Sequence, residues 1–363
     1  MQKIPSVPPV GLLNLSRKKQ IYYEHSSHNN SSMDFYNDNY NYDLYNICYM
    51  NSVIQCLFRL DKFVANILVS EGKNLLNASK DLLIKMINYK ADRNIILSVE
   101  KIKKAIEQID ERYKNNNCED VNEFISNYLD GLLEETKHED ILVYKENSFL
   151  DYQVEKPAYI RFFNRFYSKK GDSFILDLFY GELKMQKICS HCKALQSIQF
   201  SAFNILELPI YELAKINQYS PINLKDILKE YISENKNNED ICNICHTKSI
   251  YSKTEIFKLP KYLIIYFGRT VENDYISSDI NFPSQMDFYD FICKKDEINT
   301  YDNVYNLKSV IYYYSIRKKL GHYTASCKCD YKEYYFDDSE VIEKTKANIL
   351  GNPIILFYEN IKA

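Results

Sequence analysis

The residues of this chain with the clearest potential for chemistry are a cysteine, a histidine and an aspartate that lie far apart in the sequence. Cys48 comes directly before a helical pattern, and His322 and Asp337 follow far downstream. A thiolate can attack a carbonyl carbon, a histidine can carry the proton, and a carboxylate can orient that histidine. Such triads are assembled by the fold and not by adjacency in sequence. The pattern therefore predicts nucleophilic catalysis by a thiol.

Cys48 is expected at the N-terminus of a helix over residues 49–60. The unpaired amides and the dipole at that end of a helix favour the thiolate and lower the pKa of the thiol. Cysteines without such a context are most often small buried side chains. We expect that of Cys56, Cys118, Cys293, Cys327 and Cys329.

Four further cysteines form two C-x-x-C pairs, which predict a metal site: Cys189 with Cys192, and Cys242 with Cys245. Each pair can place two thiolates on one tight turn, and two such turns complete the tetrahedron that zinc prefers. Because four cysteine ligands leave no open position, the zinc is expected to be structural, and no catalytic metal is expected. The neighbouring His191 and His246 are alternative ligands.

The elements that must position these residues change in character along the chain. Helical periodicity at 80–89, 98–109 and 119–135 follows the helix after Cys48, and β-rich runs begin near residue 158. Helices first and a mostly antiparallel sheet afterwards predict an α+β fold. One later helix is expected at 223–233, and strands are expected at 174–180, 197–200, 262–267, 307–314, 323–327 and 353–358. The run at 334–341 is expected to contain a short strand that ends in carboxylates.

Composition argues against several functional classes. The 363 residues carry a formal net charge of −3, with a sequence pI ≈ 6.1, so no basic field argues for nucleic acid. No apolar stretch approaches the roughly 18 residues of a membrane helix, and residues 1–20 lack the apolar region of a signal peptide. We therefore expect a monomer without membrane or nucleic-acid partners. We expect the protein to be located in the reducing cytoplasm or nucleus. If the source is a virus, this would be the cytoplasm or nucleus of the host cell.

Two segments around the predicted triad carry a family resemblance. The sequence from Cys48 reads C-Y-M-N-S-V-I-Q-C-L, and the sequence from Gly321 reads G-H-Y-T-A, followed by F-D-D at 336–338. They resemble the Cys box (C-Y-x-N-S-x-L-Q-x-L) and the His box of the ubiquitin-specific proteases, which are papain-like deubiquitinases. The resemblance extends from about Gly11 to Glu359, so no accessory ubiquitin-like domain is expected within these residues.

The resemblance implies a role for each residue of the site. Cys48 is expected to be the nucleophile and His322 the general base. Asp337 is expected to orient the imidazole, with Asp338 as a second polar group nearby. The two cysteine pairs correspond to the zinc-binding part of the family's fingers.

The oxyanion donor is where this chain departs from the family. The family has an Asn five positions before the Cys, within G-L-x-N-x-G-N-T-C, but this chain has Asp43 there. An ionised carboxylate cannot donate a hydrogen bond and repels an oxyanion. Residues 11–15 read G-L-L-N-L and resemble the first half of that motif. We therefore expect Asn14 to return to the site across a low-complexity insertion at 15–43, with backbone amides near Cys48 as the alternative.

The sequence C-E-D-V-N-E-F from Cys118 resembles the family's Q-Q-D-A-x-E-F-L. The resemblance implies that Asp120, Glu123, Phe124 and Tyr323 bind the extended, basic tail of ubiquitin. Read without the resemblance, acidic residues here are equally typical of a helix N-terminus, where they face the helix dipole.

The fold implied is papain-like, with a helical thumb, zinc-bearing β fingers and an antiparallel β palm. The chain would then be a tail at 1–10 and one catalytic domain at 11–363, with the thumb at 44–160, the fingers at 170–255 and the palm at 256–360. The implied function is hydrolysis of the bond after the C-terminal Gly of ubiquitin, with ubiquitin or ubiquitinated proteins as partners.

Other functions stay open on the sequence. One is a ubiquitin-binding pseudoenzyme, favoured by Asp43, Tyr45 and Ile47, which replace family residues before Cys48. Another is a protease for a different ubiquitin-like modifier or for a polyprotein with a Gly-Gly site. A zinc-finger nucleic-acid binder is opposed by the acidic pI and by the absence of a basic helix.

Overall fold

The computed structural model describes residues 5–13, 46–90, 97–115, 117–138, 155–217, 220–271, 274–293, 303–317 and 320–362. The chain forms two compact units: Met1–Glu135 with Ser309–Gly351, and Thr136–Lys308 with Asn352–Ala363. The first unit contains the predicted catalytic residues, and the second contains the two cysteine pairs. No helix within the described ranges is long and apolar enough to cross a membrane.

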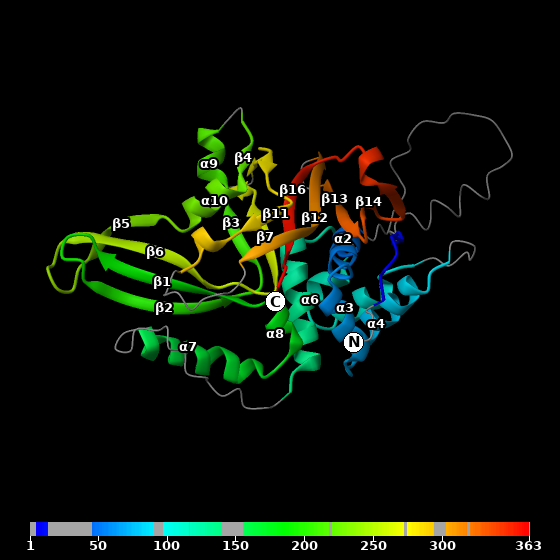
Figure 1. Cartoon of the computed structure of the whole chain (residues 1–363), viewed down its shortest axis with the longest axis horizontal. Helices are drawn as coiled ribbons and strands as arrows, with labels where there is room; N and C mark the ends of the chain where they lie inside the picture. The colour runs from blue at the N-terminus through cyan, green and yellow to red at the C-terminus, as the bar shows by residue number, and fades with distance from the viewer. Residues whose placement is uncertain are drawn as a thin grey trace. The chain divides into compact units, whose positions relative to one another are not determined.

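Helix α2 (Cys48–Leu57) is the central helix of the first unit, and all of its residues are buried. It packs against strands β13 (Leu320–Cys329) and β14 (Lys332–Asp337), as Figure 1 shows. On another side it holds the N-terminal segment 5–13, because the Gln55 amide donates to the Val10 carbonyl over 2.6 Å. The other helices of this unit are α3 (Asp61–Val69), α4 (Asn74–Ile87), α5 (Glu100–Ile106), η1 (Glu111–Lys114), α6 (Val121–Thr136) and η3 (Lys344–Lys346).

Strands of the first unit pair in chain order as an antiparallel meander. The part of β12 (Val304–Arg317) from residue 309 onward pairs with β13, β13 with β14, and β14 with β15 (Glu340–Glu343). Tyr314 faces His322 across the first pair, and Ala325 faces Phe336 across the second. This meander places His322 and Asp337 on neighbouring strands.

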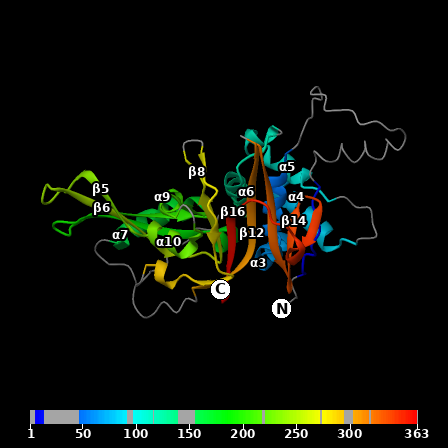
Figure 2. The same ribbon diagram turned by 90° about the horizontal axis from the view of Figure 1, so that it is seen from above.

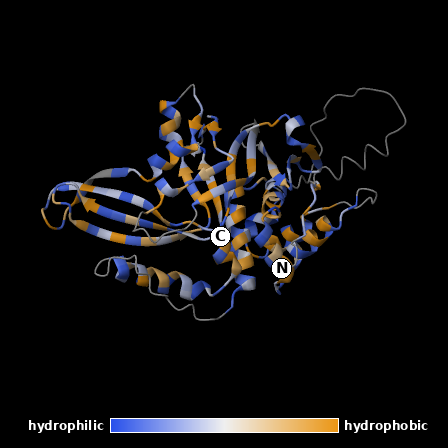
Figure 3. Cartoon of the chain, in the orientation of Figure 1, coloured by the Kyte–Doolittle hydropathy of each residue, from blue (hydrophilic) through white to orange (hydrophobic). Residues whose placement is uncertain are grey.

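The second unit contains a four-stranded antiparallel sheet in the order β2-β1-β6-β5. Figure 2 shows these long strands from above, and Figure 3 shows hydrophilic and hydrophobic residues interspersed along them. Helix α7 (Glu155–Lys170) packs against the sheet, since the Tyr159 ring lies 5.2 Å from Phe200 and 5.5 Å from Phe257 between centroids. The strands are β1 (Gly181–Cys189), β2 (Leu195–Phe203), β5 (Glu234–Ile241) and β6 (Lys248–Lys258).

A second group of strands in this unit contains β7 (Tyr262–Gly268) between antiparallel β16 (Asn352–Asn360) and parallel β3 (Leu206–Pro209). Strand β7 is almost entirely buried, as its apolar sequence predicts. The remaining elements are α8 (Phe174–Phe179), α9 (Tyr211–Ile216), β4 (Ile222–Asn223), α10 (Leu224–Tyr231), β8 (Thr270–Val271), β9 (Asp274–Tyr275), β10 (Ile280–Asn281), β11 (Gln285–Asp287) and η2 (Tyr289–Phe291).

The predicted strand at 174–180 is wrong, because residues 174–179 form helix α8. The Ser173 side chain accepts a hydrogen bond from the Ile175 amide over 3.2 Å and caps the helix. A short apolar run fits a buried strand and a buried helix equally well, so periodicity alone does not separate them. Helix α7 was also not predicted. The structure confirms the other predicted helices and strands, with boundaries shifted by a few residues.

Candidate active site and cysteine cluster

Cys48 is the first residue of α2 and is fully buried. Its sulfur lies 3.2 Å from Oδ1 of Asn46, and the backbone N–H of Tyr323 points at it over 3.5 Å. The N-cap residue Ile47 offers no side-chain acceptor to the first amides of the helix. The sulfur therefore lies at a helix N-terminus, the end that favours an anion.

His322 and Asp337 are joined by a hydrogen bond of 2.7 Å between Nε2 and Oδ1. Burial by itself lowers the pKa of His322. The hydrogen bonds to Asp337 and Cys48 outweigh burial and raise the pKa to about 10, from an ordinary value of 6.5. With Nε2 on the carboxylate, Nδ1 is the ring nitrogen available to Cys48. This is the geometry of a base held in one orientation by a carboxylate.

Cys118 lies beside Cys48 and is not the buried core residue that the sequence suggested. The pKa of Cys48 is raised well above its ordinary value, and the largest cause is the interaction with the Cys118 thiol. Burial also raises this pKa, whereas His322 lowers it. Cys118 itself is only partly buried. At neutral pH the arrangement favours the thiol of Cys48 beside a protonated His322, so a proton must leave the pair before the sulfur can attack.

Asp338 is held at the turn after β14 by the N-terminal half of the unit. It is buried, has a left-handed backbone (φ 51°), and accepts a hydrogen bond of 2.8 Å from Nδ2 of Asn51. Its carbonyl accepts from the Leu12 amide over 2.9 Å. A Cβ on Gly11 would lie 2.2 Å from the backbone oxygen of Ser339, so only glycine allows the segment to pass there.

The structure thus brings His322, Asp337 and Asp338 together. A ring nitrogen of the histidine and one carboxylate oxygen of each aspartate lie within 4.8 Å of one another. Asn51 was not among the predicted site residues, although it lies within the Cys box that begins at Cys48. Residues 14–45 lie outside the described part of the chain. The expected return of Asn14, and the surroundings of Asp43, therefore stay predictions.

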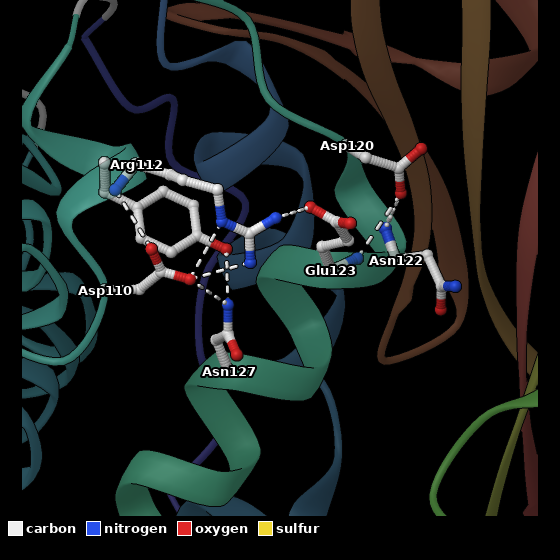
Figure 4. A network of polar contacts seen from close by, with 7 residues as sticks. Asp110, Arg112, Asp120, Asn122, Glu123 and Asn127 are labelled. Atoms are coloured by element: carbon white, nitrogen blue, oxygen red, sulfur yellow. Dashed lines mark hydrogen bonds and ion pairs between the residues drawn. The ribbon is translucent and has the colours of Figure 1, made fainter.

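Two of the predicted substrate residues lie at the start of α6, where Figure 4 shows them. The Asp120 carboxylate caps this helix, since it accepts from the amides of Asn122 over 2.7 Å and Glu123 over 3.3 Å. Burial raises the pKa of Asp120, while these amides act against it. The Glu123 carboxylate pairs with Arg112, which also binds Asp110 over 2.7 Å. Asp120 therefore has the geometry of an acidic residue at a helix N-terminus, as the alternative interpretation of the sequence predicted. Contact of Asp120 and Glu123 with a substrate stays a prediction.

The other two predicted substrate residues have little exposed surface. Phe124 is fully buried, with its ring 5.4 Å from Tyr49 and 5.8 Å from Tyr113 between centroids. Tyr323 is 6% exposed and packs on Tyr313 at 4.8 Å. Both occupy positions of core residues, so their role toward a substrate stays a prediction.

The four paired cysteines of the second unit form one cluster, in which all sulfurs lie within 4.8 Å of one another. Cys189 and Cys245 are 3.6 Å apart, as are Cys192 and Cys242. Both turns have the same construction. The amides of Lys193 and His246 donate to the carbonyls of Cys189 and Cys242, and both donors have a left-handed backbone (φ 60° and 56°).

The electrostatics of the cluster fit a site for a cation. The Ser249 hydroxyl and nearby backbone amides lower the pKa of Cys189 to about 5. The Ala194 amide lowers the pKa of Cys192, but burial and the other sulfurs outweigh it and raise that pKa to about 12. Crowded thiols oppose one another's ionisation, and a metal ion relieves this because it binds the thiolates. The donor set is therefore one that could hold a metal ion.

Comparisons with known proteins agree with this arrangement. A family model described as ubiquitin carboxyl-terminal hydrolase matches residues 41–358. Human ubiquitin carboxyl-terminal hydrolase 2 is 27% identical over 338 residues, which cover 87% of this chain and 54% of that protein. The Usp2 hydrolase of Drosophila melanogaster is 25% identical over 333 residues, which cover 86% of this chain and 34% of that protein. The chain thus spans about half the length, or less, of these relatives.

Solved structures show the same fold. One matched structure is a yeast SAGA deubiquitinating (DUB) module with a mutant of Sgf73. The matched chain has a TM-score of 0.66 and 16% identity, over 99% of this chain and 70% of that one. The same kind of module bound to ubiquitin aldehyde gives a TM-score of 0.67 at 16% identity, with the same coverage. The expected α+β fold of the ubiquitin-specific protease type is confirmed. With its reactive residues placed as described and most of its length matched by the family model, the chain belongs to the ubiquitin carboxyl-terminal hydrolase family.

Proposed function

We propose that the chain is a deubiquitinating cysteine protease, which cleaves the peptide or isopeptide bond after the C-terminal Gly of ubiquitin. The observation that carries the proposal is the His322–Asp337 hydrogen bond of 2.7 Å, on the strands that pack against the helix bearing Cys48. Family membership supports the thiol chemistry and the substrate class.

In the proposed reaction, His322 first releases its own proton to solvent. The neutral imidazole then takes the proton of Cys48, and the thiolate attacks the carbonyl carbon of the terminal Gly. The tetrahedral intermediate collapses as the C–N bond breaks, and His322 gives the proton to the leaving amine. A water molecule, deprotonated by His322, then attacks the thioester and releases ubiquitin and the thiol. Asp337 holds the imidazole in orientation and stabilises its charged form throughout.

The experiment has two parts, hydrolysis of a fluorogenic ubiquitin amide and capture by ubiquitin with a C-terminal thiol-reactive group. We expect Cys48→Ala to abolish both. Cys56→Ala, which changes a second cysteine of the same helix, is expected to retain both. Neither hydrolysis nor adduct with folded wild-type protein would overturn the proposal.

A second candidate is a ubiquitin-binding protein with impaired catalysis. The raised pKa of the Cys48 thiol beside Cys118 favours it, because a thiol is a poor nucleophile. Ubiquitin binding without Cys48-dependent turnover would support this candidate, and turnover lost in Cys48→Ala would exclude it.

For the cysteine cluster we propose a structural zinc ion, held by Cys189, Cys192, Cys242 and Cys245. Four protein ligands leave zinc no position for substrate, so the ion would join the two turns without taking part in the reaction. We also propose the division into a thumb at 44–160, fingers at 170–255 and a palm at 256–360, with the zinc ion in the fingers.

A further inference from the structure

Asn46 is the residue whose carboxamide touches the reacting sulfur. Its Oδ1 lies 3.2 Å from Sγ of Cys48, two residues away along the chain, and its side chain is only partly exposed. The contact is formed at the start of α2, ahead of the N-cap residue Ile47. The side chain therefore lies at the sulfur atom that would attack the substrate.

A carboxamide can serve both charge states of that atom. Its oxygen accepts a hydrogen bond from the neutral thiol, and its nitrogen carries two donors. Rotation of the carboxamide by about 180° around the Cβ–Cγ bond exchanges the oxygen and the nitrogen with almost no change in shape. Either atom can therefore face the sulfur. When the proton leaves and negative charge forms, the donor side becomes the favourable one.

The second asparagine described near this site, Asn51, has its donors engaged. The Asn51 amide is engaged by Asp338 over 2.8 Å and by the Leu12 carbonyl over 3.4 Å. At the fifth position before Cys48 the sequence has Asp43, which cannot donate when ionised. A tetrahedral intermediate on Cys48 needs donors within about 2.7–3.1 Å of its oxyanion. The Asn46 carboxamide lies 3.2 Å from the sulfur on which that intermediate would form.

We propose that Asn46 is a catalytic residue that donates a hydrogen bond from Nδ2 to the oxyanion of the tetrahedral intermediate formed on Cys48. The proposal rests on the proposed function. It assigns to Asn46 the task that the sequence analysis gave to Asn14.

Two variants separate this role from a structural one. Asn46→Ala removes the carboxamide. Asn46→Asp keeps its shape and its acceptor for the thiol but cannot donate when ionised. We expect both to lower kcat on a fluorogenic ubiquitin amide by ~10²-fold, with KM changed less than about threefold. Asn88→Ala, an exposed asparagine at the end of α4, is the matched control and is expected to keep wild-type kcat.

A readout specific for the oxyanion is the ratio of two affinities. Ubiquitin aldehyde forms a tetrahedral adduct with the thiol, whereas free ubiquitin does not. We expect both Asn46 variants to weaken the aldehyde by a factor close to the loss in kcat and to bind free ubiquitin like wild type.

The outcomes are distinct. Wild-type kcat in Asn46→Asp, or equal weakening of aldehyde and free ubiquitin, would overturn the role of Asn46 alone. Wild-type protein that neither hydrolyses the amide nor binds the aldehyde would overturn the proposed function, and the role of Asn46 with it.

Discussion

The hydrogen bond between His322 and Asp337 predicts a pH dependence of stability that one substitution removes. The pKa of His322 is about 10 in the folded protein, against an ordinary value of 6.5. Between these values the folded protein holds a proton that the unfolded chain has released. The free energy of unfolding therefore falls as pH rises, by up to about 1.4 kcal/mol per pH unit from this group. The contribution is fully present below pH 6.5 and is lost as pH rises through about 10.

Asp337→Asn keeps the shape of the side chain and removes its charge, so the pKa of His322 should fall toward 6.5. Between pH 7 and 9 the decline in unfolding free energy should then be shallower than in wild type, by about 1 kcal/mol per pH unit. Urea unfolding at pH 7, 8 and 9 measures the slopes, with tyrosine fluorescence as the signal because the chain has 33 Tyr and no Trp. The matched control is Asp330→Asn, on the exposed β13–β14 turn, which should leave the slope unchanged.

Parallel pH profiles for wild type and Asp337→Asn would refute this reasoning, because the carboxylate would then not be the cause of the raised pKa. The same variant should lower kcat by ~10²–10⁴, since the imidazole loses the acceptor that orients it. Full turnover in Asp337→Asn would contradict the orienting role, whatever the stability data show.

Three further predictions concern other parts of the chain. Gly11→Ala should lower Tm by about 5 °C or more, because its Cβ would lie 2.2 Å from a backbone oxygen of the β14–β15 turn. Gly268→Ala, whose nearest neighbours lie at 3.7 Å, should leave Tm almost unchanged; equal effects would disprove the steric argument. Cys118→Ala should lower the pKa of Cys48, because the Cys118 thiol is the largest cause that raises it. More thiolate is then present, so alkylation of Cys48 at pH 7 should become about tenfold faster or more. An unchanged rate of alkylation would count against the contact between the two thiols. Cys242→Ser should reduce bound zinc from about one ion per chain and lower Tm; metal analysis that finds none in wild type contradicts the proposed zinc site.

Residue types and local periodicity were enough to predict many of the helices, the strands and the reactive side chains of this protein. Cys48, His322 and the paired cysteines are identifiable because thiolate attack, proton transfer and zinc binding each require particular side chains at recognisable spacing. Helices such as α4 and α6 follow from an apolar stripe, which is a property of a few consecutive turns.

Only the tertiary structure decided which of these groups touch. Residues 174–179 form a helix that Ser173 caps, and Cys118 became a neighbour of Cys48 only through packing. Asn46 and Asn51 are both asparagines near one cysteine, yet one contacts its sulfur and the other is engaged by Asp338. The physical reason is that a hydrogen bond is made or lost over less than an ångström. Such distances are set by segments remote in sequence, whereas side-chain type and helical period are local.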